Sequence, residues 1–91
     1  MTASRLAKPS KTPLGLAEAL GLVLRCGFEN SCRVQGVSFV AGELSRLTGL
    51  HQTKDAISKY LERRGLKLGS AKEHGFDCLV LDDKARRIAH A

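Results

Sequence analysis

The sequence predicts a small α+β domain in which three helices are followed by a C-terminal β-hairpin. Apolar residues recur at helical spacing in three segments that begin near residues 13, 39 and 52, and each segment ends at a glycine. Residues 66–68 and 78–81 have the apolar pattern of two strands around the polar stretch GSAKEHG, as in a hairpin. The length of 91 residues allows one modest hydrophobic core and therefore one domain.

The composition is that of a globular protein, with 43% hydrophobic and 26% charged residues. No apolar run approaches the roughly 20 residues that span a bilayer. The N-terminus lacks the apolar segment of a secretory signal, and we expect no membrane partner. Its basic, acid-free start faintly resembles an organelle transit peptide, although a basic arm is the simpler interpretation.

The three cysteines, Cys26, Cys32 and Cys78, show no paired CxxC spacing. An odd number of thiols without such pairing is typical of a cytosolic protein, and we expect a cytoplasmic, nucleoid-associated location. A metal site would require Cys26 and Cys32 to recruit histidines from distant parts of the chain. The sequence therefore predicts neither a metal nor a cofactor.

The net charge of +6 is concentrated in two segments. Residues 1–17 carry three basic and no acidic residues, and residues 51–67 carry five basic and two acidic residues. The intervening and C-terminal segments, 18–50 and 68–91, are each balanced. A basic tail with one basic helix suits a polyanion, whereas evenly scattered charge would indicate only solubility.

Residues 1–12 show no helical or strand period and contain Pro9, which predicts a flexible basic arm. Such an arm can enter a minor groove, or it can serve only to keep the chain soluble. Its basic residues are Arg5, Lys8 and Lys11.

The first helix is expected to start at Thr12 and Pro13, a hydroxyl cap followed by a first-turn proline. It should run to about Cys26 and stop at Gly27. Its apolar positions at helical spacing are Leu16, Leu20, Val23 and Leu24.

A short strand and a second helix are expected next. The stretch RVQGVSF, residues 33–39, has the alternating β-branched character of a strand, with Gly36 as an interruption. Ser38 can then cap a helix over residues 39–48, which Gly49 ends. The apolar stripe of this helix is Val40, Leu44 and Leu47.

The third helix is expected over residues 52–64, with Gly65 as its stop. Laid out at about 100° per residue, it has one apolar and one polar face. The apolar face holds Thr53, Ala56, Ile57, Tyr60 and Leu61. The opposite face holds His51, Gln52, Asp55, Ser58, Lys59, Glu62 and Arg63, with Lys54 on the flank. We expect Tyr60 and the stem of Arg64 to pack against the core.

The hairpin places Lys72 and His74 near its tip. Asp82 can cap a last short helix, so residues 82–91 are expected to form a short C-terminal helix or a tail. Its apolar content is thin.

This order of elements resembles the winged helix-turn-helix family of DNA-binding domains over residues 13–81. The resemblance is carried by ELSRLTGL at 43–50, AISKYLERRGL at 56–66 and the hairpin up to Leu81. It implies that the third helix enters the major groove and that the second helix braces it. It also implies that the hairpin, or wing, touches the DNA backbone or the minor groove.

The spacing after the turn departs from the family's pattern. Commonly the first buried aliphatic of the third helix follows the turn glycine by about six residues. Here Ala56 is seven and Ile57 eight residues after Gly49, so the turn is longer or the helix begins earlier. This leaves open which side chains near the helix start reach base edges.

The outward carboxylates, Asp55 and Glu62, are a second departure, because they would face phosphate. Asp55 can pair with Lys59 or accept a hydrogen bond from a cytosine amino group.

The predicted DNA-binding residues lie on the outward face of the third helix and in the wing. The alternative is an ordinary solvated helix face and a polar turn. Base reading is assigned to Gln52, Asp55, Ser58 and Lys59, and backbone contacts to Lys54, Arg63 and Lys72. The full predicted set is His51, Gln52, Thr53, Lys54, Asp55, Ser58, Lys59, Arg63, Lys72 and His74.

No catalytic arrangement is recognisable: the histidines lack a nucleophile partner and no phosphate-binding glycine loop follows a strand. We therefore expect no enzyme. We expect instead a homodimer that binds double-stranded DNA sequence-specifically, most simply a small plasmid- or phage-type transcriptional repressor that occludes a promoter. The alternatives are an excisionase-like architectural protein, a winged helix used for protein–protein assembly, and an RNA-binding domain.

Overall fold

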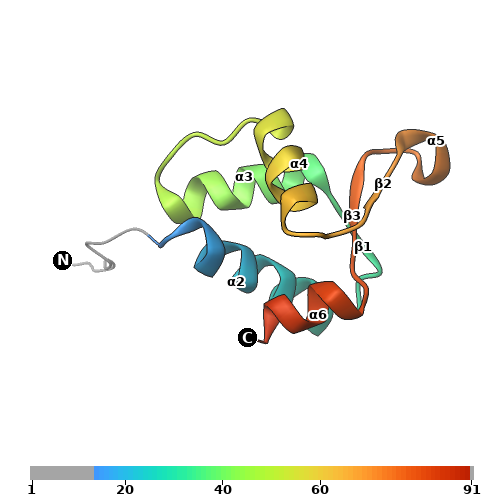
Figure 1. Cartoon of the computed structure of the whole chain (residues 1–91), viewed down its shortest axis with the longest axis horizontal. Coiled ribbons are helices and arrows are strands. Elements are labelled where there is room, and N and C mark those ends of the chain that lie inside the picture. The colour runs from blue at the N-terminus through green and yellow to red at the C-terminus, as the bar shows by residue number, and fades with distance from the viewer. Residues whose placement is uncertain (1–13, 91) are drawn as a thin grey trace.

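The computed structural model describes residues 14–90, so the basic arm and the Thr12–Pro13 cap lie outside the described residues. The expected start of the first helix at Thr12 and Pro13 was wrong, because this helix begins at Leu16 with Gly15 as its N-cap. Within residues 14–90 the chain forms an α+β fold with five helices and one three-stranded antiparallel sheet (Figure 1). The α+β class is confirmed. The helix count differs from the expected three, because one helical turn lies between the hairpin strands and a further helix follows them.

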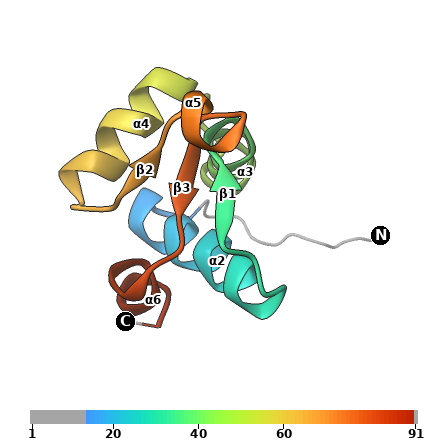
Figure 2. The same ribbon diagram turned by 90° about the vertical axis from the view of Figure 1, so that its right-hand side faces the viewer.

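In chain order the elements are α2 (Leu16–Glu29), β1 (Val34–Gly36), α3 (Val37–Thr48), α4 (Lys54–Arg63), β2 (Leu68–Gly69), α5 (Ala71–His74), β3 (Cys78–Val80) and α6 (Asp83–Ala89). The α3 helix packs between α2 and α4, and α6 packs along α2. Figures 1 and 2 show the sheet at one end of this helical layer, with α5 at its outer tip.

The strand order is β1-β3-β2, so the expected hairpin strands pair and β1 adds a third strand. Leu68 lies opposite Leu79 in one pair, and Val34 lies opposite Val80 in the other. The central strand β3 therefore joins a segment before α3 to a segment after α4. The sheet is thus attached both to the start of α3, through β1, and to the end of α4, through β2.

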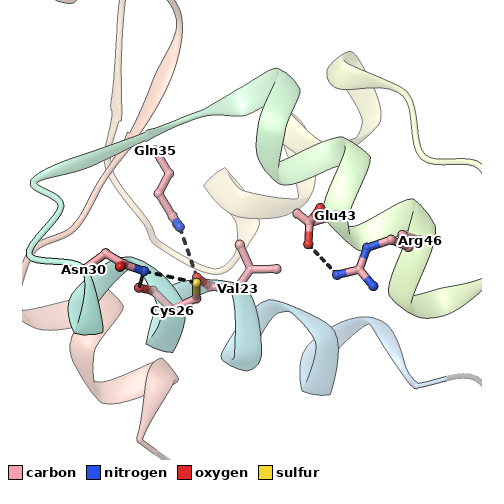
Figure 3. A network of polar contacts seen from close by, with 6 residues as sticks. All are labelled: Val23, Cys26, Asn30, Gln35, Glu43 and Arg46. Carbon is pink, nitrogen blue, oxygen red and sulfur yellow. Dashed lines mark hydrogen bonds and ion pairs between the residues drawn. The ribbon is translucent and has the colours of Figure 1, made fainter. Parts of the chain in front are cut away.

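Gly27 does not stop the first helix; that prediction was wrong. The α2 helix continues to Glu29, and Gly27 is buried inside it. A Cβ at Gly27 would lie 2.8 Å from both Gln35 Nε2 and Leu81 Cδ1. The glycine therefore lets the side-chain ends of Gln35 and Leu81 lie directly against α2. Gln35 uses that proximity to donate from Nε2 to the Val23 carbonyl at 3.0 Å (Figure 3).

The second helix begins two residues earlier than expected, and Ser38 is not its cap. The strand ends at Gly36, which is the N-cap, and Val37 is the first helical residue. The Val37 N–H donates to the Asp77 carbonyl at 3.0 Å, so the neighbouring loop satisfies one of the N–H groups that the start of a helix leaves without an intrahelical partner. At the other end Gly49 has a φ of 73°, which confirms the predicted glycine stop.

The core is aliphatic, as the composition predicts. Fully buried side chains from all three long helices and the central strand meet in it, and burial of this apolar surface is the main source of stability. Its largest members are Leu20, Leu24, Leu44, Ile57, Leu61 and Leu79.

The C-terminal helix α6 is built from small residues. Asp82 is its N-cap and accepts from the Ala85 N–H at 3.1 Å, as expected from the sequence. Ala85 and Ala89 are buried against α2, which explains how a helix of thin apolar content packs. The Arg25 guanidinium on α2 donates to the Ala89 carbonyl, with Nη2 at 3.0 Å. The last turn of α6 is thereby fastened to α2.

Across residues 14–90, none of the helices combines the length and the apolar character needed to cross a bilayer.

Candidate nucleic-acid interface

The turn between α3 and α4 is long and held by hydroxyl groups. It spans residues 49–53. The spacing after Gly49 therefore reflects a longer turn and not an earlier start of the third helix. Ser45 Oγ accepts from the Gln52 N–H at 2.8 Å and donates to the Ala41 carbonyl at 2.8 Å. Thr48 Oγ1 accepts from the Leu50 N–H at 3.3 Å. These bonds fix the path by which the chain enters α4.

Thr53 caps α4 instead of facing the core. Its Oγ1 accepts from the Ala56 N–H at 3.1 Å, and α4 starts at Lys54, two residues later than expected. Thr53 and Ala56 are both exposed, so their assignment to the apolar face was wrong. The buried stripe of α4 consists of Ile57 and Leu61. A narrower stripe leaves more of the helix surface open to a ligand.

Tyr60 and Arg64 pack beside that stripe, as expected. Tyr60 is half-buried against the core, and Arg64 Nη1 donates to its hydroxyl at 2.8 Å. The guanidinium carbon lies 5.8 Å from the ring centroid, within the range of a cation–π contact.

Most side chains on the outward face of α4 are exposed. Lys59 and Arg63 lie four residues apart and therefore on one side of the helix, about 6 Å apart along its axis. Asp55 and Lys59 are not within ion-pair distance: among residues 14–90 the ion pairs within 4.0 Å are Glu43–Arg46 and Lys54–Asp77. The exposed members of the predicted set around α4 are His51, Thr53, Lys54, Asp55, Lys59 and Arg63.

Two of the predicted residues turn partly inward. Gln52 is half-buried in the turn. Ser58 is also half-buried and lines a hollow of about 260 Å³ between α4 and the sheet, together with Leu68 and Ser70. The structure thus places Ser58 at the junction of α4 and the wing, on a different side from Lys59.

The segment from β2 to β3, residues 68–80, corresponds to the expected wing and is given that name below. It contains a helical turn in place of a simple loop. Ser70 Oγ accepts from the Glu73 N–H at 3.3 Å and starts α5, and Gly75 ends it with a φ of 84°. Lys72 and His74 are both exposed on this turn. The His74 ring folds back over Gly69, where an added Cβ would lie 2.6 Å from Nε2.

Asp77 connects the wing to α4 and was not identified from the sequence. Its Oδ2 lies 3.1 Å from Lys54 Nζ, and its Oδ1 accepts from the Ala71 N–H at 3.2 Å. One carboxylate thus contacts the first residue of α4 and the first residue of α5. The hydrogen bond and positive charge of Lys54 lower the pKa of Asp77, with a smaller contribution from the Ala71 N–H. No local pattern marks the ion pair of Asp77, because Lys54 lies on another element, before the hairpin.

The positive charge of this surface comes from α4 and not from the wing. The wing carries one cation, Lys72, against the carboxylates Glu73 and Asp77. Figure 2 shows α4 beside the sheet, with α5 above the strand ends. The exposed cations of this surface are therefore concentrated on α4, and the segment from β2 to β3 beside it carries more acidic than basic residues.

In the described part of the chain, no group of three His, Cys, Asp or Glu side chains is placed to hold a metal ion. Comparisons with protein-family models, curated proteins and solved structures give no match.

Proposed function

We propose that this chain is a winged helix-turn-helix protein that binds double-stranded DNA sequence-specifically and acts as a small transcriptional repressor. In this proposal α3, the turn and α4 form the helix-turn-helix, and β2, α5 and β3 form the wing. The α4 helix enters the major groove with Lys59 toward base edges and Arg63 toward the backbone.

The observation that carries the proposal is the exposure of two cations, Lys59 and Arg63, that have no ion-pair partner among residues 14–90. Both are exposed on one side of α4, and neither lies within ion-pair distance of a carboxylate in the described residues. Cations that are already paired must give up a partner to bind phosphate, whereas these two need only lose water and counterions.

Preorganisation of α4 supports the same function. The helix is fixed by the Ser45–Gln52 hydrogen bond before it, by the Thr53 cap and by the Lys54–Asp77 ion pair. A helix that is already ordered loses little conformational entropy on docking, so more of the contact energy appears as affinity.

The size of the domain supports a dimer and a simple mechanism. One module of this size makes a modest DNA interface, and a two-fold dimer on a palindromic site would double it. Repression by occlusion requires only that the bound dimer covers a promoter. This proposal includes a cytoplasmic, nucleoid-associated location and no catalytic activity.

The test is selection from a random duplex library, followed by affinity measurements across salt concentrations. Lys59→Ala should relax base preference within the selected site. Arg63→Ala should preserve the preferred site and reduce the slope of log K against log salt by about one. Arg87→Ala serves as a matched control, because Arg87 is also an exposed arginine but lies on α6.

The proposal fails if duplex DNA is not bound, or if binding is indifferent both to sequence and to Lys59→Ala. Binding that bends DNA at repeated sites without affecting transcription would instead indicate the excisionase-like role.

A further inference from the structure

A shallow apolar groove lies between α2 and α3, on a surface that the proposed DNA contacts do not use. Its volume is about 180 Å³, and its lining includes Leu22, Cys26, Phe39 and Leu47. Leu22 is 43% exposed and Phe39 is 53% exposed, although both are large apolar side chains. Exposed apolar side chains that adjoin one another mark interaction surfaces more often than isolated ones do.

The charged groups in the groove lining are one acid and one base that neutralise each other. Arg46 Nη2 lies 2.6 Å from Glu43 Oε1, and Glu43 raises the pKa of Arg46 through that hydrogen bond and its charge. Figure 3 shows this pair on α3 and Cys26 on α2. The groove is therefore locally neutral in a chain whose net charge is +6.

This neutrality decides between classes of occupant. A polyanion or an acidic protein would favour an unpaired cation, and the groove lining offers none. A second copy of the chain carries the same charge of +6, and the repulsion between two copies is smaller where the facing surface carries no net charge. The groove meets that condition.

The Glu43–Arg46 pair is also complementary to itself. In a two-fold dimer, residue i of one copy faces residue j of the other, and the reverse contact follows by symmetry. Glu43 of one copy can therefore face Arg46 of its partner twice in one interface. The apolar side chains of the two grooves would be buried between these contacts.

We propose that the groove between α2 and α3 is the homodimer interface, with Phe39 and Leu22 as its apolar centre and reciprocal Glu43–Arg46 contacts at its edge. The inference rests on the homodimer of the proposed function and names its surface. All groove residues belong to α2 and α3, so α4 and the wing remain uncovered in the dimer.

The test is sedimentation equilibrium of the full chain over a wide concentration range. The wild type should form a dimer. Phe39→Ser should raise the dissociation constant of this dimer at least about tenfold, as truncation of a central aromatic does. Phe76→Ser is the matched control, because Phe76 is 47% exposed at the wing. It should leave the dissociation constant unchanged.

A charge exchange makes the test independent of folding defects. Glu43→Arg and Arg46→Glu should each weaken self-association, because like charges then face each other. A mixture of the two variants should form a heterodimer, and the double variant should recover the homodimer. Misfolded chains could not restore each other in this way.

Cys26 provides a second readout at the same groove. In a Cys32→Ser background the remaining cysteines are exposed Cys26 and buried Cys78. An added two-electron thiol oxidant, which takes up the two electrons as the two thiols lose their protons, should then link two copies through a Cys26–Cys26 disulfide, and Phe39→Ser should suppress the link.

A wild type that stays monomeric at all concentrations overturns the proposal. A dimer that is insensitive to Phe39→Ser and to the charge exchange overturns it as well. DNA binding is scored separately on a single half-site with Lys59→Ala. A monomer that binds a half-site sequence-specifically would overturn the proposed interface but leave the proposed DNA binding intact. A groove-dependent dimer that does not bind DNA would support the interface and overturn the proposed function.

Discussion

Lys54 Nζ lies 3.1 Å from Asp77 Oδ2, which joins the first residue of α4 to the loop that leads into β3. The same carboxylate holds the start of α5 through the Ala71 N–H. A negative charge thus lies between the two elements that we propose to contact DNA. Asp77 contacts both the wing and α4, and in the proposed complex it would compete with phosphate for Lys54.

Removing the charge of Asp77 should strengthen DNA binding. Asp77→Asn keeps an oxygen that can accept from the Ala71 N–H, while it frees Lys54 and removes a repulsive charge. Charges a few ångströms apart are least screened at low salt, so we expect roughly fivefold tighter binding there. The slope of log K against log salt should steepen by about one.

Asp83→Asn is the control, since it makes the same charge change at an exposed site on α6. Affinity that is unchanged or lower in Asp77→Asn would show that Asp77 acts only as an anchor for the wing.

The Lys54–Asp77 pair should also make stability depend on pH in the acid range. The pKa of Asp77 in the folded chain is below its ordinary value of 3.8. The stabilisation of the folded state by this pair is therefore fully present above about pH 3.8, and it is lost as the pH falls through the folded-state pKa of Asp77. The Tm difference between wild type and Asp77→Asn should be constant near neutrality. It should shrink and then disappear as the pH falls below 3.8.

Thermal unfolding followed by circular dichroism from neutral to strongly acidic pH measures this difference. Glu62→Gln controls for the loss of an exposed carboxylate outside ion-pair distance. A difference for Asp77→Asn that persists at the acid limit would contradict the assignment.

Two helix glycines should respond to alanine in opposite directions. At Gly42 an added Cβ meets nothing within 4 Å, so Gly42→Ala should stabilise the chain by about 0.5–1 kcal/mol through helix propensity. At Gly27 the Cβ would lie 2.8 Å from Gln35 and Leu81. Overpacking costs about 1–3 kcal/mol, which exceeds the gain in propensity.

Denaturant unfolding of both variants measures the two changes in the free energy of unfolding. Stabilisation by Gly27→Ala would show that β1 and α2 are less closely packed than described.

Gln35 should be replaceable by an apolar residue of similar shape. It is buried, its Nε2 donates to the Val23 carbonyl, and its Oε1 has no hydrogen-bond partner among residues 14–90. Gln35→Met removes both the bond and the unpaired oxygen, so we expect a change below about 1 kcal/mol in the free energy of unfolding.

Gln35→Glu is the contrasting variant, because it introduces a buried carboxylate without a cation. We expect it to lower the free energy of unfolding by about 3 kcal/mol or more at neutral pH, with partial recovery in acid. Equal effects of the two variants would contradict this account.

The features that the sequence predicted are those governed by local chemistry. The glycines after α3 and α4 end them with positive φ, at 73° for Gly49 and 79° for Gly65. Asp82 caps α6, and Leu44, Ile57 and Leu61 reach the core as their spacing predicts. In each case the cause lies within about one helical turn of the residue, where the sequence can be read directly.

Tertiary structure decided the features whose partners are distant in the chain. Gly27 is a packing position because β1 and Leu81 reach it, and Thr53 caps α4 because the long turn brings the chain in at that residue. Asp77 links α4 to the wing only because the hairpin strand β2 packs beside α4 in space. Periodicity therefore established the α+β class and the outward cations Lys59 and Arg63. The sheet pairings and the charge between α4 and the wing arose from contacts that no local spacing encodes.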